Sequence, residues 1–304
     1  FSYNEDLVVV KNDKEEIRIS ANDFQKQARF LLTKLKLKTS ATFSIPEIEE
    51  FINSFNSHSL KAKSTIKSDI RIVIHDQRTG TDPELGFSIK SQLGGASTLL
   101  NAGKTTNFIY KVNNLKLSDK QIKEINAIDT KSKIRDRIEI LKENTGILQF
   151  GIPESSVFEN NLVLIDSALP KIISEILLLF FTSNHSRMSD LVTEISKINP
   201  LGYNLENNHP FYSYKVKRFL TDVALGIMPS KVWTGELDTT GGYLVVKDNG
   251  EILCYHIYNR NEFEDYLFTN TKLETPSSTR HKFGTVYKQD KQLYFKLNLQ
   301  IRFL

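Results

Sequence analysis

Two short segments carry an acidic and a basic side chain in a pattern that could hydrolyse a phosphodiester. Apolar residues recur at every second position in residues 69–76 (DIRIVIHD) and 85–92 (LGFSIKSQ), which predicts two β-strands. Asp69 begins the first segment, and Lys90 lies near the end of the second. Metal-assisted hydrolysis needs an acidic oxygen that holds a divalent ion and a cation near the attacking water or the developing charge. These two residue types supply both.

The sequence between the two segments predicts an antiparallel pair. Residues 77–84 (QRTGTDPE) are rich in turn formers. A turn at Gly80-Thr81 would bring Asp69 opposite Gln92, with Lys90 one same-face step away. The polar face of this pair would then carry Asp69, Arg71, Ser88, Lys90 and Gln92, with the isoleucines and Phe87 packed behind. A solvated sheet face with outward charges fits the same pattern, so spacing alone leaves both interpretations open.

Helical and strand patterns alternate around this pair and predict a mixed α/β fold. Residues 20–37 have helical periodicity, and Ser20 and Asp23 are spaced like a capping box. A soft boundary near residue 200 separates an α/β region, 1–200, from a β-rich region, 201–304. Further helices are predicted at 44–56, 118–128, 132–143, 172–181, 210–225 and 259–269, a strand at 147–151, and hairpins at 243–258 and 285–303.

Composition indicates an ordinary globular chain and excludes several kinds of site. The 304 residues are 39% hydrophobic and 25% charged, with a formal net charge of +4 that is compatible with a polyanionic partner. A single cysteine excludes an intramolecular disulfide and a multi-cysteine zinc site, and the six histidines lack zinc-ligand spacing. No apolar run approaches the roughly 20 residues of a membrane helix, and the first residues lack a signal-peptide pattern. We therefore expect no membrane association and a reducing cytoplasm.

Two longer strings of residues are far more specific than the spacing of Asp69 and Lys90. The first is Glu84-Leu85-Gly86-Phe87-Ser88-Ile89-Lys90-Ser91-Gln92-Leu93-Gly94, continued by Ser97–Ala102 and Thr106-Asn107-Phe108. The second comprises Thr240–Tyr243, Tyr258–Asn261, Thr271–Ser277, Arg280-His281 and Leu299–Phe303. Both resemble restriction endonucleases of the HpaII family. The strings lie within a stretch that covers most of the chain from about residue 66 onward.

That resemblance implies a fold, an activity and a set of site residues. The activity is that of a type II enzyme that cuts duplex DNA at a short palindrome, with CCGG expected, and leaves 5′-phosphate ends. The fold is a PD-(D/E)xK core in which a mixed sheet is flanked by helices, with Asp69 and Lys90 at the catalytic positions. The cofactor is Mg²⁺, bridged by Asp69 with a further oxygen from the Ile89 carbonyl. Ser88 or Gln92 would replace the usual second acid, and such neutral ligands predict weaker ion binding before DNA supplies a phosphate oxygen.

The chain departs from the family pattern at its start. The family has an upstream helix with a Gly-Glu-Trp-Ser-Glu signature, whereas the only tryptophan here is Trp233. Either the numbered chain begins after that helix or the helix is absent, so residues 1–200 are expected to form a nuclease core that lacks it. Glu47, Glu49 and Glu50 are the alternatives for an acid contributed by an N-terminal helix.

Several polar residues are candidates for DNA contact. Residues 102–106 (AGKTT) look like the end of a phosphate-binding loop, but Thr98 occupies the position of the required glycine, so no nucleotide cofactor is expected. Arg135-Asp136-Arg137 would either read guanines or form a solvated helix face. The C-terminal cations and hydroxyls suit phosphate and base contacts. The candidate DNA-binding residues are Asn101, Lys104, Thr105, Asn107, Arg135, Arg137, Arg260, Lys272, Ser277, Arg280 and His281.

Two other functions remain open at this point. A PD-(D/E)xK nuclease of different specificity, such as a repair enzyme, would share the core but not the C-terminal string. A DNA-binding protein that has lost catalysis would explain Ser88 in place of an acid. In each case the partner is double-stranded DNA and the expected location is a bacterial or archaeal cytoplasm. A palindrome can be read by a homodimer or by a monomer that cuts one strand at a time, so a homodimer is one possibility.

Overall fold

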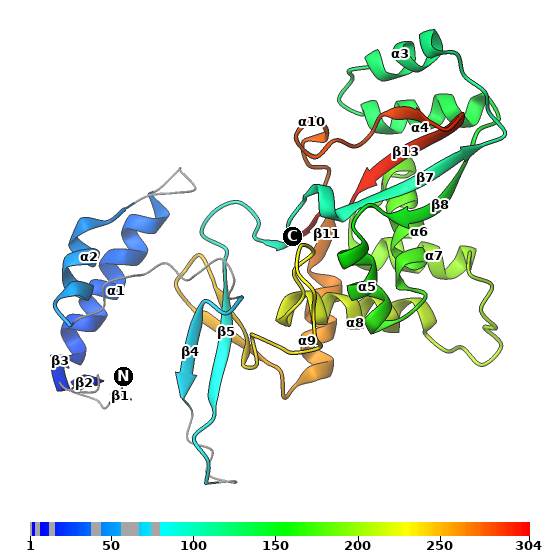
Figure 1. Cartoon of the computed structure of the whole chain (residues 1–304). Helices are drawn as coiled ribbons and strands as arrows, with labels where there is room; N and C mark the ends of the chain where they lie inside the picture. The colour runs from blue at the N-terminus through cyan, green and yellow to red at the C-terminus, as the bar shows by residue number, and fades with distance from the viewer. Residues whose placement is uncertain (1, 4–6, 12–15, 38–43, 56–66, 74–79) are drawn as a thin grey trace.

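A computed structural model of the chain has the mixed α/β character predicted from the sequence (Figure 1). It describes residues 2–3, 7–11, 16–37, 44–55, 67–73 and 80–304. Helices and strands alternate along the chain, and the described strands form two four-stranded and two three-stranded sheets. His58 and His75, two of the six histidines, and the end of the predicted strand 69–76 lie outside the described residues.

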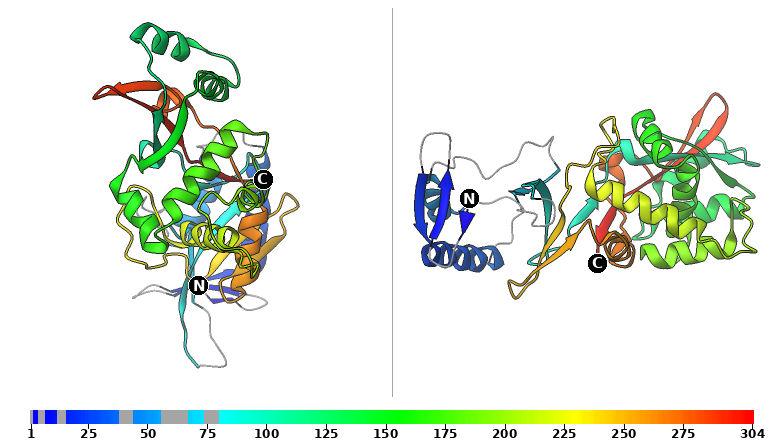
Figure 2. Two further views of the ribbon diagram at one scale, coloured as in Figure 1. Left: turned by 90° about the vertical axis from the view of Figure 1, so that its right-hand side faces the viewer. Right: turned by 90° about the horizontal axis from the view of Figure 1, so that it is seen from below.

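The N-terminal elements form a small unit of their own. A three-stranded sheet, β1 (Ser2–Tyr3), β2 (Leu7–Lys11) and β3 (Glu16–Ser20), is followed by α1 (Ala21–Lys36) and α2 (Pro46–Asn53). Phe24, Phe51 and Phe55 join the two helices, with ring centroids 5.2–5.7 Å apart. The helix predicted at residues 20–37 is confirmed, but Ser20 makes no side-chain capping bond, so the capping box is wrong. In the right-hand view of Figure 2 this unit lies to one side of the other elements, and the side chain of Leu32 on α1 lies close to Gly250.

A mixed sheet carries the segments that the sequence analysis singled out. Its strand order is β10-β9-β5-β4, from β4 (Ile70–Val73), β5 (Glu84–Ser91), β9 (Gly242–Val246) and β10 (Ile252–His256). The β4–β5 and β9–β10 pairs are antiparallel, as predicted, whereas β5 and β9 run parallel. This sheet, called the catalytic sheet below because it carries the candidate residues Asp69 and Lys90, therefore combines strands that lie some 150 residues apart in sequence.

The register of the strand pair differs from the prediction. Ile70 lies opposite Phe87, and the Asp69 amide donates to the Phe87 carbonyl at 2.8 Å, so Asp69 falls beside Ser88 and not opposite Gln92. The difference is four residues. Because side chains alternate with a period of two, an even shift leaves each residue on its predicted face. Asp69, Ser88 and Lys90 consequently still share one face of the sheet.

The expected apolar layer behind that face is only partly present. Phe87 is buried against Gly241 and near His256, as predicted. Ile70, Ile72 and Ile89 are instead 36–41% exposed, so the prediction that the isoleucines are packed is wrong for these three. Ile70 and Ile72 lie on β4, the edge strand, whose residues are all exposed, and Ile89 lies on the neighbouring strand β5.

The remaining strands form two sheets that join both halves of the chain. One has the order β12-β13-β7-β8 and the other β11-β14-β6. Strands from before and after residue 200 therefore pair in three of the four described sheets, and the expected division at residue 200 does not separate them. The strands are β6 (Thr98–Leu100), β7 (Asn107–Asn113), β8 (Ile147–Pro153), β11 (Thr271–Leu273), β12 (Val286–Gln289), β13 (Gln292–Asn298) and β14 (Ile301–Phe303).

Helices pack against these sheets and build the core. α6 is apolar enough to be buried on most of its surface, as predicted, and it contacts α4, α5, α7 and α8. No described helix combines the length and apolar composition that crossing a membrane requires. The helices are α3 (Asp119–Ala127), α4 (Lys133–Glu143), α5 (Ser156–Ile165), α6 (Leu169–Thr182), α7 (Met188–Ile198), α8 (Phe211–Leu225), α9 (Arg260–Thr269) and α10 (Ser278–His281).

Candidate active site

Asp69 is held by its neighbours on β5. Its carboxylate oxygen Oδ2 accepts hydrogen bonds from the Ser88 hydroxyl at 3.0 Å and the Ile89 amide at 2.7 Å. The other oxygen, Oδ1, has no hydrogen bond to a described residue. Two donors on one oxygen fix the orientation of the carboxylate and leave the second oxygen available. Ser88 therefore orients the acid, a role different from the ligand role expected for it.

Lys90 lies on the same face, one alternate position along β5 from Ser88. Its ammonium nitrogen lies 5.0 Å from the centre of the buried Tyr243 ring, a cation–π contact. Burial lowers the pKa of Lys90, and the negative charge of Asp69 opposes this shift. The pair thus places one acid and one half-buried cation on a common surface, which is the combination that the sequence predicted.

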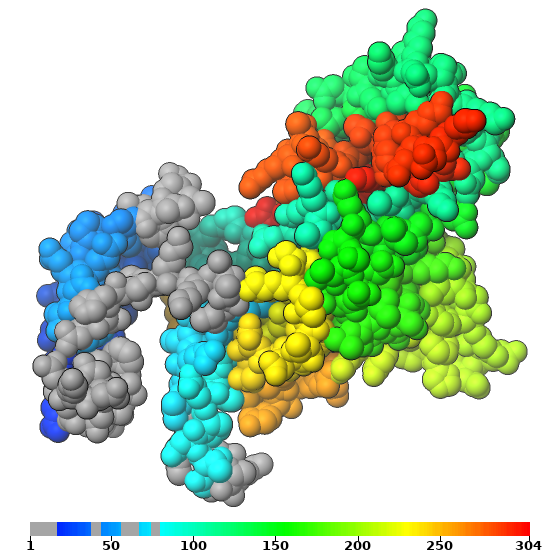
Figure 3. All heavy atoms as spheres, viewed as in Figure 1, coloured from blue at the N-terminus to red at the C-terminus, as the bar shows by residue number. Residues whose placement is uncertain are grey.

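A cavity of about 400 Å³ opens onto these residues. The catalytic sheet contributes Asp69, Ser88 and Lys90, the loop after β6 contributes Asn101 and Thr105, and the segment after α8 contributes residues 227–230. In Figure 3 the chain that follows α8, drawn in yellow, lies directly against the cyan strands β4 and β5. The cavity is therefore bounded by residues 67–105 and by residues 227–230, two parts of the chain that are far apart in sequence.

Gln92 lies outside this cavity. It lines a smaller neighbouring cavity of about 230 Å³, which shares only Lys90 with the first. The backbone amide of Gln92 donates to the Val246 carbonyl at 2.9 Å. Gln92 is thus not brought beside Asp69. The reason is the four-residue difference in register, which carries Gln92 beyond the end of the β4 pairing.

A second acid does not join Asp69 among the described residues. Asp69 is the only acidic residue that lines the cavity, and no described cluster contains three His, Cys, Asp or Glu side chains suited to a metal. None of the three alternatives on α2, Glu47, Glu49 and Glu50, lines the cavity. Glu47 pairs with Lys34, and Glu49 accepts from the Ser44 hydroxyl. The free Oδ1 is a hard oxygen ligand of the kind that Mg²⁺ takes, and one carboxylate fits a weakly held ion completed by substrate oxygens.

Lys67 is a residue of the cavity that the sequence analysis missed. Its ammonium donates to the Val223 and Ile227 carbonyls, the latter at 2.9 Å. Burial lowers the pKa of Lys67 to about 7, the charge of Lys90 adds to this shift, and that of Asp238 opposes it. Alternation along the strand could have indicated Lys67, because it stands two residues before Asp69 and would point to the same face. Both residues line the cavity.

Comparison with known proteins decides the family. Residues 1–303 match the family model described as HpaII restriction endonuclease. The chain belongs to this family. A relative from Haemophilus parainfluenzae, named Type II restriction enzyme HpaII, is 50% identical over 302 residues, which cover 99% of this chain and 83% of the relative. No solved structure matches the chain.

Membership of the HpaII family confirms the resemblance drawn from the two sequence strings. The chain is accordingly a type II restriction endonuclease, a site-specific DNA-cutting enzyme whose substrate is DNA. Ser88, Ile89 and Lys90 belong to the first of those strings, and Asp69 lies beside them in the fold. The geometry described above can now be compared with the predicted DNA contacts.

Part of the HpaII-family loop after β6 faces the active-site cavity. Asn101 and Thr105 line it, and Lys104 is exposed in a short 3₁₀ turn, Lys104–Thr106. Asn107 is different, because it is fully buried and its amide donates to Glu154 at 2.7 Å and to the His281 carbonyl at 3.0 Å. This side chain joins β7 to α10 and has no group free for a base, contrary to its expected role.

The two arginines of α4 also differ from the expectation. Arg137 is 5% exposed, and its guanidinium donates to the carbonyls of Gly284, Asn126 and Ile128. It forms neither a guanine-reading group nor a solvated helix face, because its donors point into the protein. Arg135 is half-buried, and its guanidinium donates to the Ser183 carbonyl and, at 2.9 Å, to Asn184 Oδ1.

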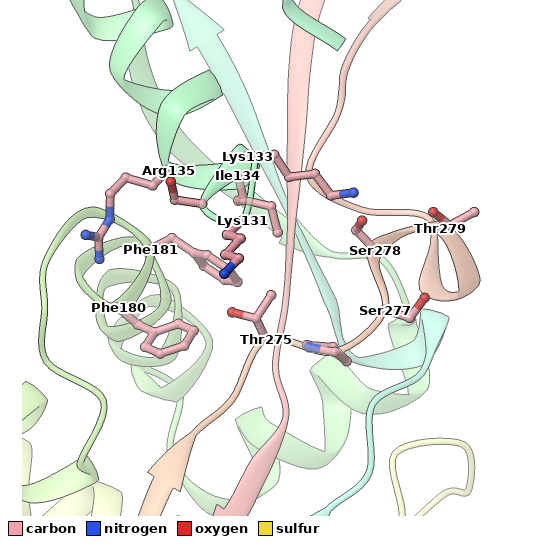
Figure 4. A pocket seen from close by; sticks show the side chains of 12 residues that line it. Lys131, Lys133, Ile134, Arg135, Phe180, Phe181, Thr275, Ser277, Ser278 and Thr279 are labelled. Atoms are coloured by element: carbon pink, nitrogen blue, oxygen red, sulfur yellow. The ribbon is translucent and has the colours of Figure 1, made fainter. Parts of the chain in front are cut away.

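Arg135 and Ser277 nevertheless line one cavity of about 390 Å³. Figure 4 shows Lys131, which precedes α4, and Lys133 and Arg135 of its first turn around one cavity with the hydroxyls of Thr275, Ser277, Ser278 and Thr279. Lys133 pairs with Asp129 at 2.8 Å, whereas Lys131 is exposed and makes no ion pair within the described chain. A cation facing several hydroxyls suits a phosphate group.

The other C-terminal candidates are spread over several surfaces. Ser277 caps α10 by accepting from the Arg280 amide at 3.3 Å, and the Arg280 side chain is exposed. Burial, with a smaller contribution from Arg280, lowers the pKa of His281. Arg260 pairs with Glu264 at 2.8 Å beside a different cavity, and Lys272 lies on β11 opposite Arg302. The structure therefore brings Ser277, Arg280 and His281 together but leaves Arg260 and Lys272 elsewhere.

Proposed function

We propose that this restriction endonuclease is a Mg²⁺-dependent enzyme of the PD-(D/E)xK type that cuts CCGG and leaves 5′-phosphate ends. The observation that carries the proposal is the oriented carboxylate of Asp69, held by Ser88 and Ile89 with Lys90 on the same face. The mixed order of the catalytic sheet supports the core type. The named relative supports the specificity class.

Each residue of the site has a proposed role. Asp69 would hold the ion through Oδ1, with the Ile89 carbonyl as a further oxygen, while Ser88 keeps Oδ2 engaged. Lys90 would face the scissile phosphate, where its charge stabilises the charge that develops on the phosphoryl oxygens. When bound, a divalent cation neutralises phosphate charge and activates water. Because one carboxylate lines the cavity, we expect ion binding that strengthens when DNA is present.

The proposed DNA-binding surface runs from the active-site cavity to α10. Asn101 and Thr105 line the cavity, and Lys104 is exposed beside Thr105. Arg280 and His281 follow on α10, which Asn107 ties to the same region. The cavity in Figure 4, with Ser277 and Arg135 in its lining, continues this surface. We propose that residues 201–304 contribute recognition through α10 and that two chains act together on the palindrome.

A digest of unmethylated plasmid tests the activity, the cofactor and the specificity together. With Mg²⁺ the chain should give discrete fragments whose sequenced ends fall at CCGG and carry 5′-phosphates, and without a divalent ion it should give none. Fragments that end at another sequence would contradict the specificity, and a smear would favour the repair-type nuclease.

Asp69→Ala and Lys90→Ala should each abolish cutting while much of the DNA binding remains.

A catalytically inactive DNA-binding protein is the second candidate, and one observation favours it. The described cavity holds a single acid where this chemistry ordinarily uses two. Band-shift and digestion experiments on the same preparation separate the two functions. Specific binding of CCGG without cutting at any Mg²⁺ or Mn²⁺ concentration would establish the second candidate, and cutting that depends on Asp69 would exclude it.

A further inference from the structure

The C-terminal end of α8 is capped by groups from the catalytic sheet and its flanking residues. The last carbonyls of a helix lack intrahelical donors and need other partners. The Ala224 carbonyl accepts from the hydroxyls of Thr239 and Tyr243, each at 3.3 Å, and the Leu225 carbonyl accepts from the Asp238 and Thr239 amides at 2.9 and 3.1 Å. The Val223 carbonyl accepts from the ammonium of Lys67. The helix end is thus the point at which the sheet is fastened to the core.

Lys67 differs from the other capping groups in charge and in position. Its ammonium spans the helix end, since it also donates to the Ile227 carbonyl at 2.9 Å, just beyond α8. A cation is favoured at this end because the helix dipole is negative there. Lys67 is also the capping residue nearest in sequence to Asp69, and both line the active-site cavity. Between them, Ser68 is buried and lies close to Gly86 of β5.

The chain from Lys67 to Asp69 is therefore fixed at both of its ends. At one end the ammonium binds α8, and at the other the Asp69 amide donates to the Phe87 carbonyl at 2.8 Å. The first residues of β4 stand at the sheet edge, where only β5 pairs with them. Without the ammonium anchor, the carboxylate of Asp69 would depend on its contacts to β5 alone.

We propose that Lys67 is a positioning residue, whose ammonium anchors the start of β4 to the end of α8 and so holds Asp69 with its free oxygen facing the cavity. Lys67 acts through Asp69 and does not itself touch the substrate. This role rests on the proposed metal-dependent cleavage, because it concerns the acid that holds the ion. It adds to that function a residue that links the catalytic strand to the helical core.

Three variants distinguish positioning from mere stabilisation. Lys67→Met keeps the length of the side chain and removes the ammonium, and Lys67→Arg restores a cation with donors. Thr239→Val is the matched control, because it removes a buried hydroxyl that caps the same helix end but lies outside the cavity. The readout is Mn²⁺ binding to the DNA-free protein, measured by electron paramagnetic resonance as a loss of the free-ion signal. This binding reports on Asp69 independently of cleavage. Asp69→Asn defines the binding that belongs to the site.

Lys67→Met should weaken the Asp69-dependent Mn²⁺ binding and lower kcat by about 10- to 100-fold, as residues that orient a metal ligand generally do. The KM for DNA should stay within about threefold of wild type, because no DNA contact is lost. Lys67→Arg should recover part of both losses. Thr239→Val should lower the melting temperature but leave Mn²⁺ binding within about twofold of wild type.

Two results would overturn the inference. One is Lys67→Met with wild-type Mn²⁺ binding and kcat, and the other is an equal loss of Mn²⁺ binding in Lys67→Met and Thr239→Val, which would show general destabilisation. Wild-type Mn²⁺ binding that is unaffected by Asp69→Asn is a different outcome. It would overturn the proposed ion site first and, with it, the role of Lys67.

Discussion

At the scale of single residues, the site depends on a difference between the two carboxylate oxygens of Asp69 in the hydrogen bonds that they accept. One oxygen receives two donors from β5 and the other receives none from described residues. Ser88 occupies the position where an acid was expected, yet its buried hydroxyl binds the acid that is present. Ser88, which the sequence analysis considered as a substitute metal ligand, thus holds the carboxylate of Asp69, the proposed ligand.

Ser88→Ala should slow cleavage by about 10- to 100-fold at fixed Mg²⁺, because Oδ2 loses one of its two donors and the carboxylate can rotate. Cleavage rates under single-turnover conditions measure this effect. Ser91→Ala is the matched control on the same strand, since its hydroxyl accepts only from the Leu93 amide and its carbonyl from Ser97. Equal rates for wild type and Ser88→Ala would show that the hydroxyl does not orient Asp69.

Arg137→Met should lower the free energy of unfolding by about 2–4 kcal/mol, because one buried and two partly buried carbonyls lose a charged donor. Urea unfolding measures this change. The preference for CCGG over other sequences should be unchanged, since the guanidinium does not reach the surface. If Arg137→Met instead stayed as stable as wild type but bound CCGG no better than other DNA, the base-reading role considered from the sequence would be restored.

At the scale of elements, α8 connects the helical core to the catalytic sheet. Carbonyls of its last turn accept hydrogen bonds from Lys67, Thr239 and Tyr243, and the same turn contains the buried acid Asp222. Burial, and secondarily the charge of Glu264, raises the pKa of Asp222 to about 6. Arg218 and Arg260 line the same cavity as Asp222, and both lie within 4 Å of Glu264.

This raised pKa makes stability fall as pH rises through a defined window. An unfolded chain would ionise Asp222 near its ordinary pKa of 3.8, whereas the folded chain holds the proton up to about 6. Between these values the folded state binds more protons than the unfolded state, so the free energy of unfolding decreases with increasing pH. Above about pH 6 the full cost of the ionised, buried acid is present.

Asp222→Asn should therefore raise the free energy of unfolding by about 1–2 kcal/mol at pH 7.5 and change it little near pH 4. The shift from 3.8 to about 6 corresponds to roughly 3 kcal/mol at full strength, and we reduce this figure because the group retains some contact with solvent. Urea unfolding at both pH values measures the difference. A variant less stable than wild type at pH 7.5 would contradict the cost assigned to the acid.

At the scale of the whole molecule, the two ends of the proposed DNA surface lie on different elements of the fold. The active-site cavity opens on the catalytic sheet, and the cavity of Figure 4 lies between α4, α6 and the residues before α10. Asn107 and Asn298 hold these regions together through buried amide contacts. DNA that spans both cavities would meet catalytic residues at one and backbone contacts at the other.

Lys131→Ala should weaken DNA binding without changing kcat. Loss of one phosphate contact should lower the slope of log Kd against log salt by about 0.9 and weaken non-specific and specific binding alike. Fluorescence anisotropy across a salt series measures both quantities. Lys120→Ala is the matched control, because Lys120 is 87% exposed on α3 and lies outside the cavity. Equal slopes in all three proteins would remove this cavity from the DNA surface.

Local patterns in the sequence were sufficient for most elements and for the face of the active site. The alternation of residues 69–73 and 85–91 is a property of the strand itself, so Asp69, Ser88 and Lys90 were placed correctly even with a register four residues off. The hairpin at Asp248-Asn249-Gly250 was equally local, and Gly250 adopts the positive φ of 89° that favours glycine. The family strings were linear as well, and the family comparison confirms them.

Only the tertiary structure decided which residues far apart in the chain are in contact. Lys67 and Val223 are 156 positions apart, Asn107 and His281 174, and Arg137 and Gly284 147. Local periodicity carries no information about such pairs, because it records which face of an element is apolar and not which distant carbonyl needs a donor. The sequence by itself therefore determined that Asp69 and Lys90 share a face, and the packing of α8 against the sheet decided what holds them there.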